Sequence, residues 1–482
     1  MAALRGTQLA RLLGQWRARP GHRRGPDYAA LATAVRALLV DGRLPLGVRL
    51  PAERELAEAL RVSRTTVSAA YGQLREAGFL ASRRGAGSWT TLPSGHRATG
   101  SGLWRPAEEP DVIDLAAAAP AAPAQLLAAA AEAVHELPRY LGGPGYHPAG
   151  LPELREAVAT RYAQRGLPTS PEQVMVTSGV QHALDLVLRL LATPGQPVLV
   201  ESPTYPNALA GLASRRARIA TYGLPDGGWE ADLLLDTVRQ VRPRLAYVIP
   251  EFHNPTGHLM PARLREQLAA TVHVTGTDLV VDESFVELAL DGAAVPPPVA
   301  SFDRHARVLS IGGMSKPYWG GLRIGWVRAA APVVQRLVAE RVGADLASPV
   351  LDQLVAVQLL RRADEIVPAR RAELAARCRA LAAALRAQLP AWRFTVPPGG
   401  VMLWVELDAP VSSALARAVE DLGVRLAPGP RFGLDGTLER FLRLPFTLPE
   451  ADLVEAVHRI ATARYDLDRT GPRAWPAEPV IA

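Results

Sequence analysis

Apolar positions in the first fifth of the chain recur with helical spacing in three consecutive segments. Residues 28–40 place apolar side chains at positions 28, 31, 35, 38 and 39, which is one face of a helix. Two further helices are predicted at residues 52–60 and 64–76, and Ser63 is a favourable N-cap for the second of them. The short turn between these two is typical of a helix-turn-helix unit. Residues 79–89 then predict two strands joined by a glycine turn, which form a wing.

Beyond residue 112 the pattern changes to short apolar runs that alternate with segments of helix length. Strands are predicted at residues 174–177, 197–200, 245–249, 278–281 and 307–311, and helices such as 181–191 and 261–270 lie between them. This alternation predicts a doubly wound α/β fold whose mostly parallel sheet is covered by helices.

The two patterned regions are separated by residues 92–112, which are rich in Gly, Pro, Ser and Glu and have no hydrophobic period. We expect a flexible linker that spans roughly 25 Å. Residues 1–26 are predicted to be a basic arm with a short helix at residues 7–16. This arm either follows DNA phosphates or is partly disordered, and both alternatives stay open. The expected division is the arm at 1–26, a helical unit at 27–91, the linker at 92–112, an α/β domain at 113–465 and a tail at 466–482.

Charge also separates the two regions. Residues 1–105 contain 17 Arg and 6 acidic residues, whereas the remainder contains 37 basic and 41 acidic residues. Net charges of +11 and −4 indicate a polyanionic partner for the first region only.

The single cysteine, Cys378, excludes an intrachain disulfide and fits a reducing compartment. No apolar run reaches the roughly 18 residues of a membrane span and no secretory signal is present, so we expect a cytoplasmic protein without a membrane partner.

The basic residues are unusual in kind, because Lys316 is the only lysine in a chain with 53 arginines. Arginine stays protonated at any accessible pH, whereas a lysine amine can lose its proton and form a Schiff base with a carbonyl group. Lys316 follows a predicted strand and precedes Arg323 by seven residues in a glycine-rich loop that suits a phosphate. A leftover surface lysine is the alternative, and the flanking sequence argues against it.

Further polar residues gather at the carboxyl ends of the predicted strands, where ligands bind in sheets of this type. They are Ser178-Gly179, Tyr205, Asn254, Asp282 and Lys316. Ser178-Gly179 opens a helix directly after a strand, which suits phosphate binding but is also common capping chemistry. Tyr205 suits stacking on a flat ligand. Asp282 is a carboxylate at a buried strand end, where it needs a cationic partner.

The first region resembles the winged helix of the GntR family. The matching segments are residues 50–57 (Leu-Pro-Ala-Glu-Arg-Glu-Leu-Ala), 62–67 (Val-Ser-Arg-Thr-Thr-Val) and 85–87 (Gly-Ala-Gly), in that family's order. The N-terminal residues of the second helix of such a unit read the major groove. The resemblance therefore implies contacts to a double-stranded DNA operator by Arg54, Arg64, Thr65, Thr66 and the wing residues Arg83 and Arg84.

The second region resembles fold-type I pyridoxal-phosphate enzymes, the aspartate aminotransferase class, from about residue 114 to 464. The motifs Ser-Gly-x-Gln, Pro-x-Tyr, Asn-Pro-Thr-Gly, Val-Asp-Glu, Ser-Lys and Gly-Leu-Arg-x-Gly occur in that family's order. The resemblance implies a large cofactor-binding subdomain at about residues 150–330. It also implies a small α+β subdomain from about residue 335.

The same resemblance implies a role for each matching residue toward pyridoxal 5'-phosphate. Lys316 would form the internal aldimine, Asp282 would bind the pyridine nitrogen, Asn254 the phenolic oxygen, and Tyr205 would cover the ring. Arg443 would grip the carboxylate of an effector or substrate, and no metal is predicted. The phosphate would be bound by Ser178, Gly179, Val180, Ser315 and Arg323, with Tyr146 reaching it from the second subunit of a homodimer.

The chain departs from this family at one position. A tyrosine usually follows the aspartate by two or three residues and donates to the phenolic oxygen, whereas Ser284 and Phe285 occupy those places. Losing this donor weakens competence for transamination, unless Ser284 substitutes for it.

A winged helix fused to an aminotransferase-like domain is the layout of MocR/GabR-type regulators, a branch of the GntR family. The resemblance implies a dimeric transcriptional regulator in which an amine or amino-acid effector forms an external aldimine at the Lys316-bound cofactor and so alters operator binding. Two alternatives stay open. One is an active aminotransferase with an accessory DNA-binding domain. The other is a vitamin B6 regulator that senses pyridoxal phosphate itself. This alternative is ranked last, because Arg443 favours an effector that carries a carboxylate.

Overall fold

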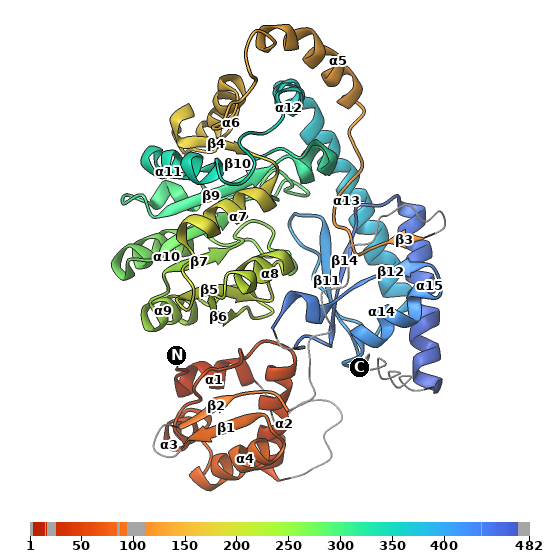
Figure 1. The fold of residues 1–482 in the computed structure, drawn as a ribbon. Coiled ribbons are helices and arrows are strands. Elements are labelled where there is room, and N and C mark those ends of the chain that lie inside the picture. Colours follow the sequence, from red (N-terminus) through yellow and green to blue (C-terminus); the bar gives the residue numbers. More distant parts are fainter. Residues whose placement is uncertain are drawn as a thin grey trace, which may run out of the picture.

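The computed structural model describes residues 3–14, 16, 26–83, 87–93, 112–434 and 436–470. These residues form a small N-terminal domain, a large α/β subdomain and a smaller C-terminal subdomain (Figure 1). No helix among them is long and apolar enough to cross a membrane. The glycine turn of the predicted wing, most of the linker, and the tail beyond residue 470 lie outside the described residues.

The N-terminal domain contains the predicted helix-turn-helix and a two-stranded antiparallel wing. Ser63 caps the second helix of this unit, because its Oγ accepts a hydrogen bond from the Thr66 N–H at 3.0 Å. Leu31, Val35 and Leu38 of the preceding long helix are buried in the same core and hold the unit together. The elements are α1 (Gly6–Leu13), α2 (Asp27–Val40), α3 (Glu53–Leu60), α4 (Arg64–Glu76), β1 (Leu80–Arg83) and β2 (Gly87–Thr90).

The large subdomain is built on a seven-stranded sheet with the strand order β4-β10-β9-β8-β7-β5-β6 in the described part of the chain. β10 runs antiparallel to both of its neighbours, and the other pairs are parallel. The predicted doubly wound, mostly parallel fold is therefore confirmed. The strands are β4 (Val174–Thr177), β5 (Pro197–Ser202), β6 (Arg218–Gly223), β7 (Leu245–Val248), β8 (Asp278–Asp282), β9 (Val308–Gly313) and β10 (Gly325–Arg328).

Helices cover this sheet, and α7 crosses its near face in Figure 1. The helices of this subdomain are α5 (Leu126–Glu136), α6 (Pro152–Gln164), α7 (Val180–Leu191), α8 (Pro206–Ser214), α9 (Ala231–Val241), α10 (Ala262–Thr275), α11 (Ala331–Arg341) and α12 (Val350–Arg361), of which α5 packs on α12 and not on the sheet. A short π-helix, η4 (Ser315–Trp319), directly follows β9 and carries Lys316. The site lysine is thus placed by the last parallel strand of the sheet.

The C-terminal subdomain packs a small sheet against two long helices. Its elements are α13 (Ala363–Gln388), β11 (Met402–Glu406), α14 (Ser412–Glu420), β12 (Val424–Arg425), β13 (Ala427–Pro428), the 3-10 helix η6 (Gly429–Phe432), β14 (Phe441–Pro445) and α15 (Glu450–Thr470). The sequence expectation starts this subdomain at about residue 335, but the structure differs. α11 and α12 bury their apolar residues in the clusters of the large subdomain, and the small-subdomain cluster takes up the helices only from Leu374 within α13.

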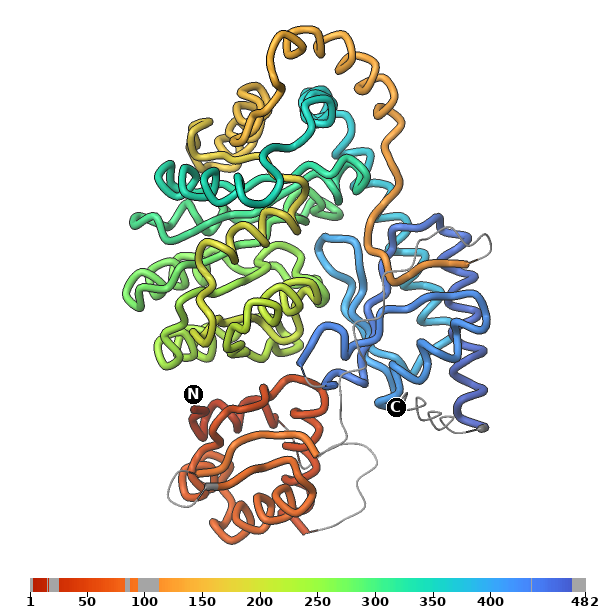
Figure 2. Tube along the Cα trace, viewed as in Figure 1, coloured from red at the N-terminus to blue at the C-terminus, as the bar shows by residue number. Residues whose placement is uncertain are grey.

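An alanine-rich strap, residues 114–123, crosses between the two subdomains. It begins at β3 (Ile113–Asp114), which pairs with β12, and leads to α5, which packs on α12 (Figure 2). Asp114 Oδ1 accepts hydrogen bonds from the N–H groups of Ala116 and Ala117 at 2.7 and 3.2 Å. This local turn fixes the direction of the carbonyl groups that follow it.

The N-terminal arm contacts protein in its described part. α1 packs against α3, and its basic side chains meet the acidic face of α9: Arg5 pairs with Asp236, and Arg11 lies 3.7 Å from Asp232. The Ala3 N–H also donates to Gln240 Oε1 at 2.9 Å. Residues 3–14 therefore lie against α3 and α9 in this structure, where the arginines have carboxylate partners.

Candidate functional site

The sheet brings the predicted strand-end residues to one edge. β4, β5, β7, β8 and β9 run in the same direction, so the residues that follow their carboxyl ends share that edge. This places Ser178, Tyr205, Asn254, Asp282 and Lys316 on one side of the molecule.

A positive cradle lies where α7 begins. Gly179 is the N-cap of α7, and Val180 is its first residue. Gly179 has φ +91°, and an added Cβ would lie 2.8 Å from Arg323 Nη2, so only glycine lets the guanidinium approach here. Arg323 Nη2 donates to the Ser178 carbonyl at 2.9 Å. A helix N-terminus beside an exposed arginine attracts an anion such as a phosphate.

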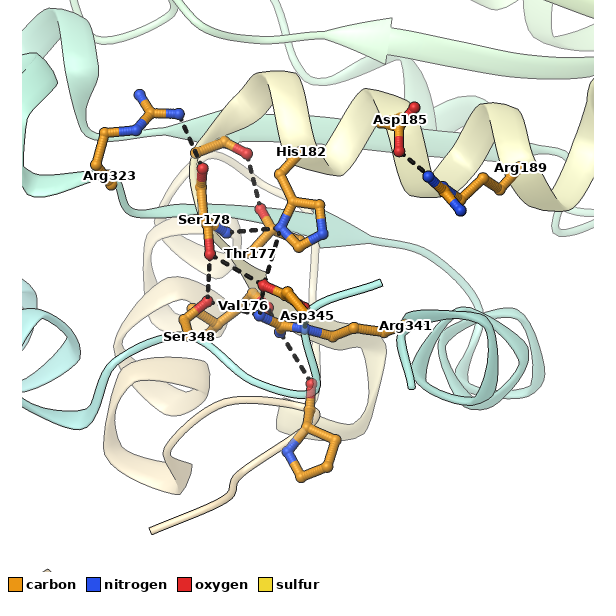
Figure 3. A network of polar contacts seen from close by, with 12 residues as sticks. Val176, Thr177, Ser178, His182, Asp185, Arg189, Arg323, Arg341, Asp345 and Ser348 are labelled. Carbon is orange, nitrogen blue, oxygen red and sulfur yellow. Dashed lines mark hydrogen bonds and ion pairs between the residues drawn. The ribbon is translucent and has the colours of Figure 1, made fainter. Parts of the chain in front are cut away.

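A polar network holds Ser178 in this cradle, as Figure 3 shows. The Ser178 N–H donates to His182 Nδ1 at 3.1 Å, and its Oγ lies 3.3 Å from both Asp345 Oδ2 and Ser348 Oγ. The fully buried Arg341 pairs with Asp345 through two hydrogen bonds of 2.7 and 3.0 Å. Burial alone would raise the pKa of Asp345, but the hydrogen bonds and charge of Arg341 outweigh this effect, so the net pKa is lowered. The carboxylate near the cradle is thus already neutralised by a partner.

Lys316 is partly buried and has a low pKa. Loss of solvation, with Arg443 as a second cause, lowers the pKa of its amine to about 8, and Asp282 opposes the shift. Its Nζ donates to the Ala118 carbonyl of the strap at 2.8 Å. At neutral pH a larger fraction of this amine is unprotonated than in a solvated lysine, which is what a nucleophilic amine requires.

Asp282 is buried and surrounded by neutral donors. Tyr247 OH donates to Oδ2 at 2.7 Å, while the Ser284 N–H and Oγ both donate to Oδ1, at 2.9 and 2.5 Å. Burial raises the pKa of Asp282, and these hydrogen bonds and Lys316 oppose the rise. Ser284, the residue that could substitute for the missing tyrosine, directs its hydroxyl to Asp282 in this structure. The buried Phe285 has no polar group to offer.

Asn254 and Tyr205 are two further site residues that follow strands of this sheet. Asn254 is buried, and its Oδ1 has no hydrogen-bond partner among the described residues. The Tyr205 hydroxyl accepts a hydrogen bond from Asn207 at 2.8 Å. Burial and the charge of Asp282 raise the pKa of Tyr205, which places the two side chains in one electrostatic environment.

Arg443 is a buried cation on β14. Burial, with Arg431 as a second cause, lowers the pKa of its guanidinium to about 10. The guanidinium stacks 5.0 Å from the centre of the Phe432 ring and donates to the Ala116 carbonyl of the strap. Its Nε has no hydrogen-bond partner within the described part of the chain. A carboxylate would satisfy this side chain fully.

Two proposed cofactor residues remain to be placed. Ser315 opens the π-helix that carries Lys316 and is partly buried. Tyr146 is 64% exposed, and the contacts of the described residues do not connect it to the other site residues. A single copy of the chain therefore does not bring Tyr146 into the site.

The donor set fits pyridoxal phosphate. The cradle of Gly179 and Arg323 brings a guanidinium to a helix N-terminus, Asn254 has a buried amide oxygen without a partner among the described residues, and Lys316 is a partly neutral amine. Asp282 adds a buried carboxylate that suits a protonated ring nitrogen.

The proposed DNA-binding side chains lie on the outer face of the N-terminal domain. Arg54, Arg64 and Thr65 are exposed, and Thr66 is partly exposed. Arg64 is 3.5 Å from Glu53, and the Thr65 and Thr66 hydroxyls bond Ser63 Oγ at 2.7 and 2.8 Å. The backbone of Arg83 ends β1, but its side chain and all of Arg84 lie outside the described residues.

Taken together, a helix-turn-helix domain and a lysine-centred anion site on a doubly wound sheet define a DNA-binding regulator fused to an aminotransferase-like domain. The chain belongs to the aminotransferase class I and II family, whose model matches residues 110–460. Residues 27–89 match the model of the bacterial regulatory proteins of the gntR family. Members of the aminotransferase class I and II family use pyridoxal phosphate.

Relatives with known names reflect both parts. The chain is similar to the "Uncharacterized HTH-type transcriptional regulator YdcR" of Escherichia coli, with 28% identity over 86% of this chain and 94% of the relative. It is 32% identical to the "Probable rhizopine catabolism regulatory protein MocR" of Rhizobium meliloti over 63% of this chain and 65% of that protein. Among solved structures, the α-aminoadipate aminotransferase LysN of Thermus thermophilus, complexed with N-(5'-phosphopyridoxyl)-L-leucine, is 32% identical. That comparison has a TM-score of 0.68 and covers 75% of this chain and 94% of LysN.

Sequence reasoning missed several groups that line this site. Tyr247 is a hydroxyl-bearing residue in a fully buried strand, which is a usable signal for a polar partner. His182 follows the Ser-Gly motif by one helical turn and contacts it directly. The carbonyl groups of Ala116 and Ala118 leave no signal in side-chain chemistry.

Proposed function

We propose that the chain is a pyridoxal-phosphate-dependent transcriptional regulator in which an amine or amino-acid effector controls operator binding. One observation carries this proposal. A gntR-family helix-turn-helix with an exposed N-terminal turn of α4 shares a chain with a site in which Lys316 and Arg443 both donate to carbonyl groups of one strap, those of Ala118 and Ala116.

In this proposal each residue has a limited task. When bound, pyridoxal phosphate supplies an electrophilic carbonyl carbon for amines. Lys316 provides the amine that holds it, and Arg323 with the N-terminus of α7 holds its phosphate. Asp282, whose carboxylate is fixed by Tyr247 and Ser284, would pair with the ring nitrogen. Arg443 orients the carboxylate of the effector.

The regulator is proposed to act as a homodimer with two operator half-sites. Large apolar side chains near the start of the α/β domain are exposed in a single chain: Leu127 is 82% exposed, Leu141 69% and Tyr146 64%. A second copy that covers them would bury apolar area and carry Tyr146 toward the partner's phosphate site.

An active aminotransferase is the second candidate, supported by the 32% identity to LysN. Against rapid turnover stands the environment of Asp282, where Ser284 is occupied and Phe285 is apolar, so neither donates to the phenolic oxygen.

The test is a visible-absorbance titration of the purified protein with candidate amines, run beside an operator-binding assay. For a regulator, absorbance changes of the bound cofactor track changes in DNA affinity, and no keto acid accumulates. Sustained production of keto acid would instead support the enzyme. Lys316→Ala is the matched control and should lose the absorbance band of the covalently held cofactor. A variant that keeps this band would refute the role of Lys316.

A further inference from the structure

The DNA-binding domain contacts the residues just before β14, the strand that carries Arg443. The Leu438 N–H donates to the Val40 carbonyl at 2.7 Å. Val40 is the last residue of α2, and the carbonyls of the last helical turn lack partners within their own helix. The small subdomain thus caps the C-terminus of a DNA-domain helix, five residues before Arg443 in the sequence.

This contact is tightly packed. Gly42 has φ +67°, and a Cβ at this position would lie 2.6 Å from Leu438 Cδ2. Leu438 is 1% exposed and itself has φ +73°, which is rare for a large side chain. Arg440 adds an ion pair, with Nε 3.6 Å from Asp41 Oδ1. We call the contact between residues 40–42 and residues 438–440 the domain joint.

Apolar packing links the domain joint to the effector arginine. Leu438 belongs to one buried cluster with Ala427, Phe432 and Phe441. Phe432 carries the guanidinium of Arg443 on its ring, and Ala427 is the cross-strand partner of Arg443. A shift of Arg443 or of β14 therefore changes the packing of the same cluster that holds Leu438.

The other side of the loop after α2 rests on the large subdomain. A Cβ at Gly223, the last residue of β6, would lie 2.4 Å from the Arg43 carbonyl oxygen, and Arg43 pairs with Asp226 at 3.0 Å. The loop at residues 40–43 thus touches both subdomains. α2 in turn packs along α4, the helix with the proposed base-reading residues.

We propose that the domain joint transmits effector binding at Arg443 to the DNA-binding domain. This inference rests on the proposed function. A ligand that changes the position of Arg443 alters the Phe432–Leu438 packing, and Leu438 then moves the C-terminus of α2 relative to the large subdomain. The coupling is a free energy shared by the two sites. If the ligand changes the affinity for DNA by some factor, DNA must change the affinity for the ligand by the same factor.

The test compares two glycines of the same domain. Gly42→Ala places a methyl group against Leu438, whereas Gly47→Ala has a similar φ of +71° but open space around it. Leu438→Ala is a second variant, which removes the side-chain packing of the domain joint without a clash. The full-length protein is titrated with a DNA fragment that wild type has selected from a random-sequence library. Titrations are run with pyridoxal phosphate and with N-(5'-phosphopyridoxyl)-L-leucine, which adds a carboxylate.

The measured quantity is the ratio of the two DNA affinities. We expect wild type and Gly47→Ala to share one ratio that differs from one. Gly42→Ala and Leu438→Ala should have ratios close to one while they still bind DNA and the adduct. Wild-type ratios in both of these variants would overturn the domain joint but leave the proposed function intact. A ratio of one in wild type itself would overturn both.

Discussion

Replacing Arg443 by methionine tests the carboxylate site directly. Methionine keeps an unbranched side chain of similar length but removes every donor. In the structure Arg443 donates to the neutral Ala116 carbonyl, and its Nε lacks a partner among the described residues. A ligand carboxylate would replace the neutral acceptor by a charged one and satisfy Nε as well. Hydrogen bonds to charged groups contribute about 1.5–3 kcal/mol, so the carboxylate should strengthen binding by about 10- to 150-fold.

Two adducts isolate this contribution. N-(5'-phosphopyridoxyl)-L-leucine carries a carboxylate, and the adduct of 3-methylbutylamine has the same side chain without it. Calorimetric titration of cofactor-free protein should show that wild type prefers the leucine adduct by the factor above, and that Arg443→Met binds both with nearly equal affinity. Because the side chain is common to both ligands, its fit cancels in the comparison.

Two results would refute this reasoning. If Arg443→Met keeps the wild-type preference, another group binds the carboxylate. If the variant weakens both adducts to the same extent, Arg443 supports the fold through Phe432 and the strap and does not recognise the ligand.

Three further predictions address the cradle, the lysine and the DNA-binding domain. Gly179→Ala should lose pyridoxal phosphate on gel filtration because its Cβ would meet Arg323, whereas Gly276→Ala, at φ +70° in open space, should retain it; equal retention would contradict the cradle. With a pKa of about 8 for Lys316, the neutral amine fraction should rise about tenfold per pH unit below that value, so stopped-flow absorbance should show cofactor capture accelerating up to pH 8 and levelling above it; acceleration up to pH 10 would contradict the lowered pKa. Ser63→Ala removes the N-cap of α4 and should lower the free energy of unfolding of the DNA-binding domain by about 1 kcal/mol in urea denaturation; an unchanged value would show that the cap is dispensable.

Much of the fold can be predicted from local sequence pattern, and the strands that were not predicted were missed for local reasons. The five predicted strands form because each is a short apolar run buried on both faces, which is the pattern of a central parallel strand. β6 was not predicted, since it lies at the sheet edge and mixes exposed with partly buried residues. β10 is four residues long and begins with Gly325, so it resembles the glycine-rich loop before it.

The candidate site likewise contains residues that the sequence predicts and contacts that it does not. Asn254, Asp282 and Lys316 could be proposed because side-chain chemistry at strand ends is visible in the sequence. The partner of Ser284 depends on a local geometry in which an aspartate accepts from the residue two positions later, and only coordinates decide between that and a bond to a ligand. The pairing of Arg5 with Asp236 joins segments more than 200 residues apart, which no periodicity reports.

The strap adds a thermodynamic reason for a graded response. Lys316, Arg443 and Arg370 each donate to a strap carbonyl, from Ala118, Ala116 and Ala121. A cofactor or effector that binds the first two cations must exchange these bonds for its own, so its net affinity is a difference between two similar sets of interactions. Exchange of this kind keeps the two arrangements close in free energy, and a modest preference of the ligand for one of them then shifts the population.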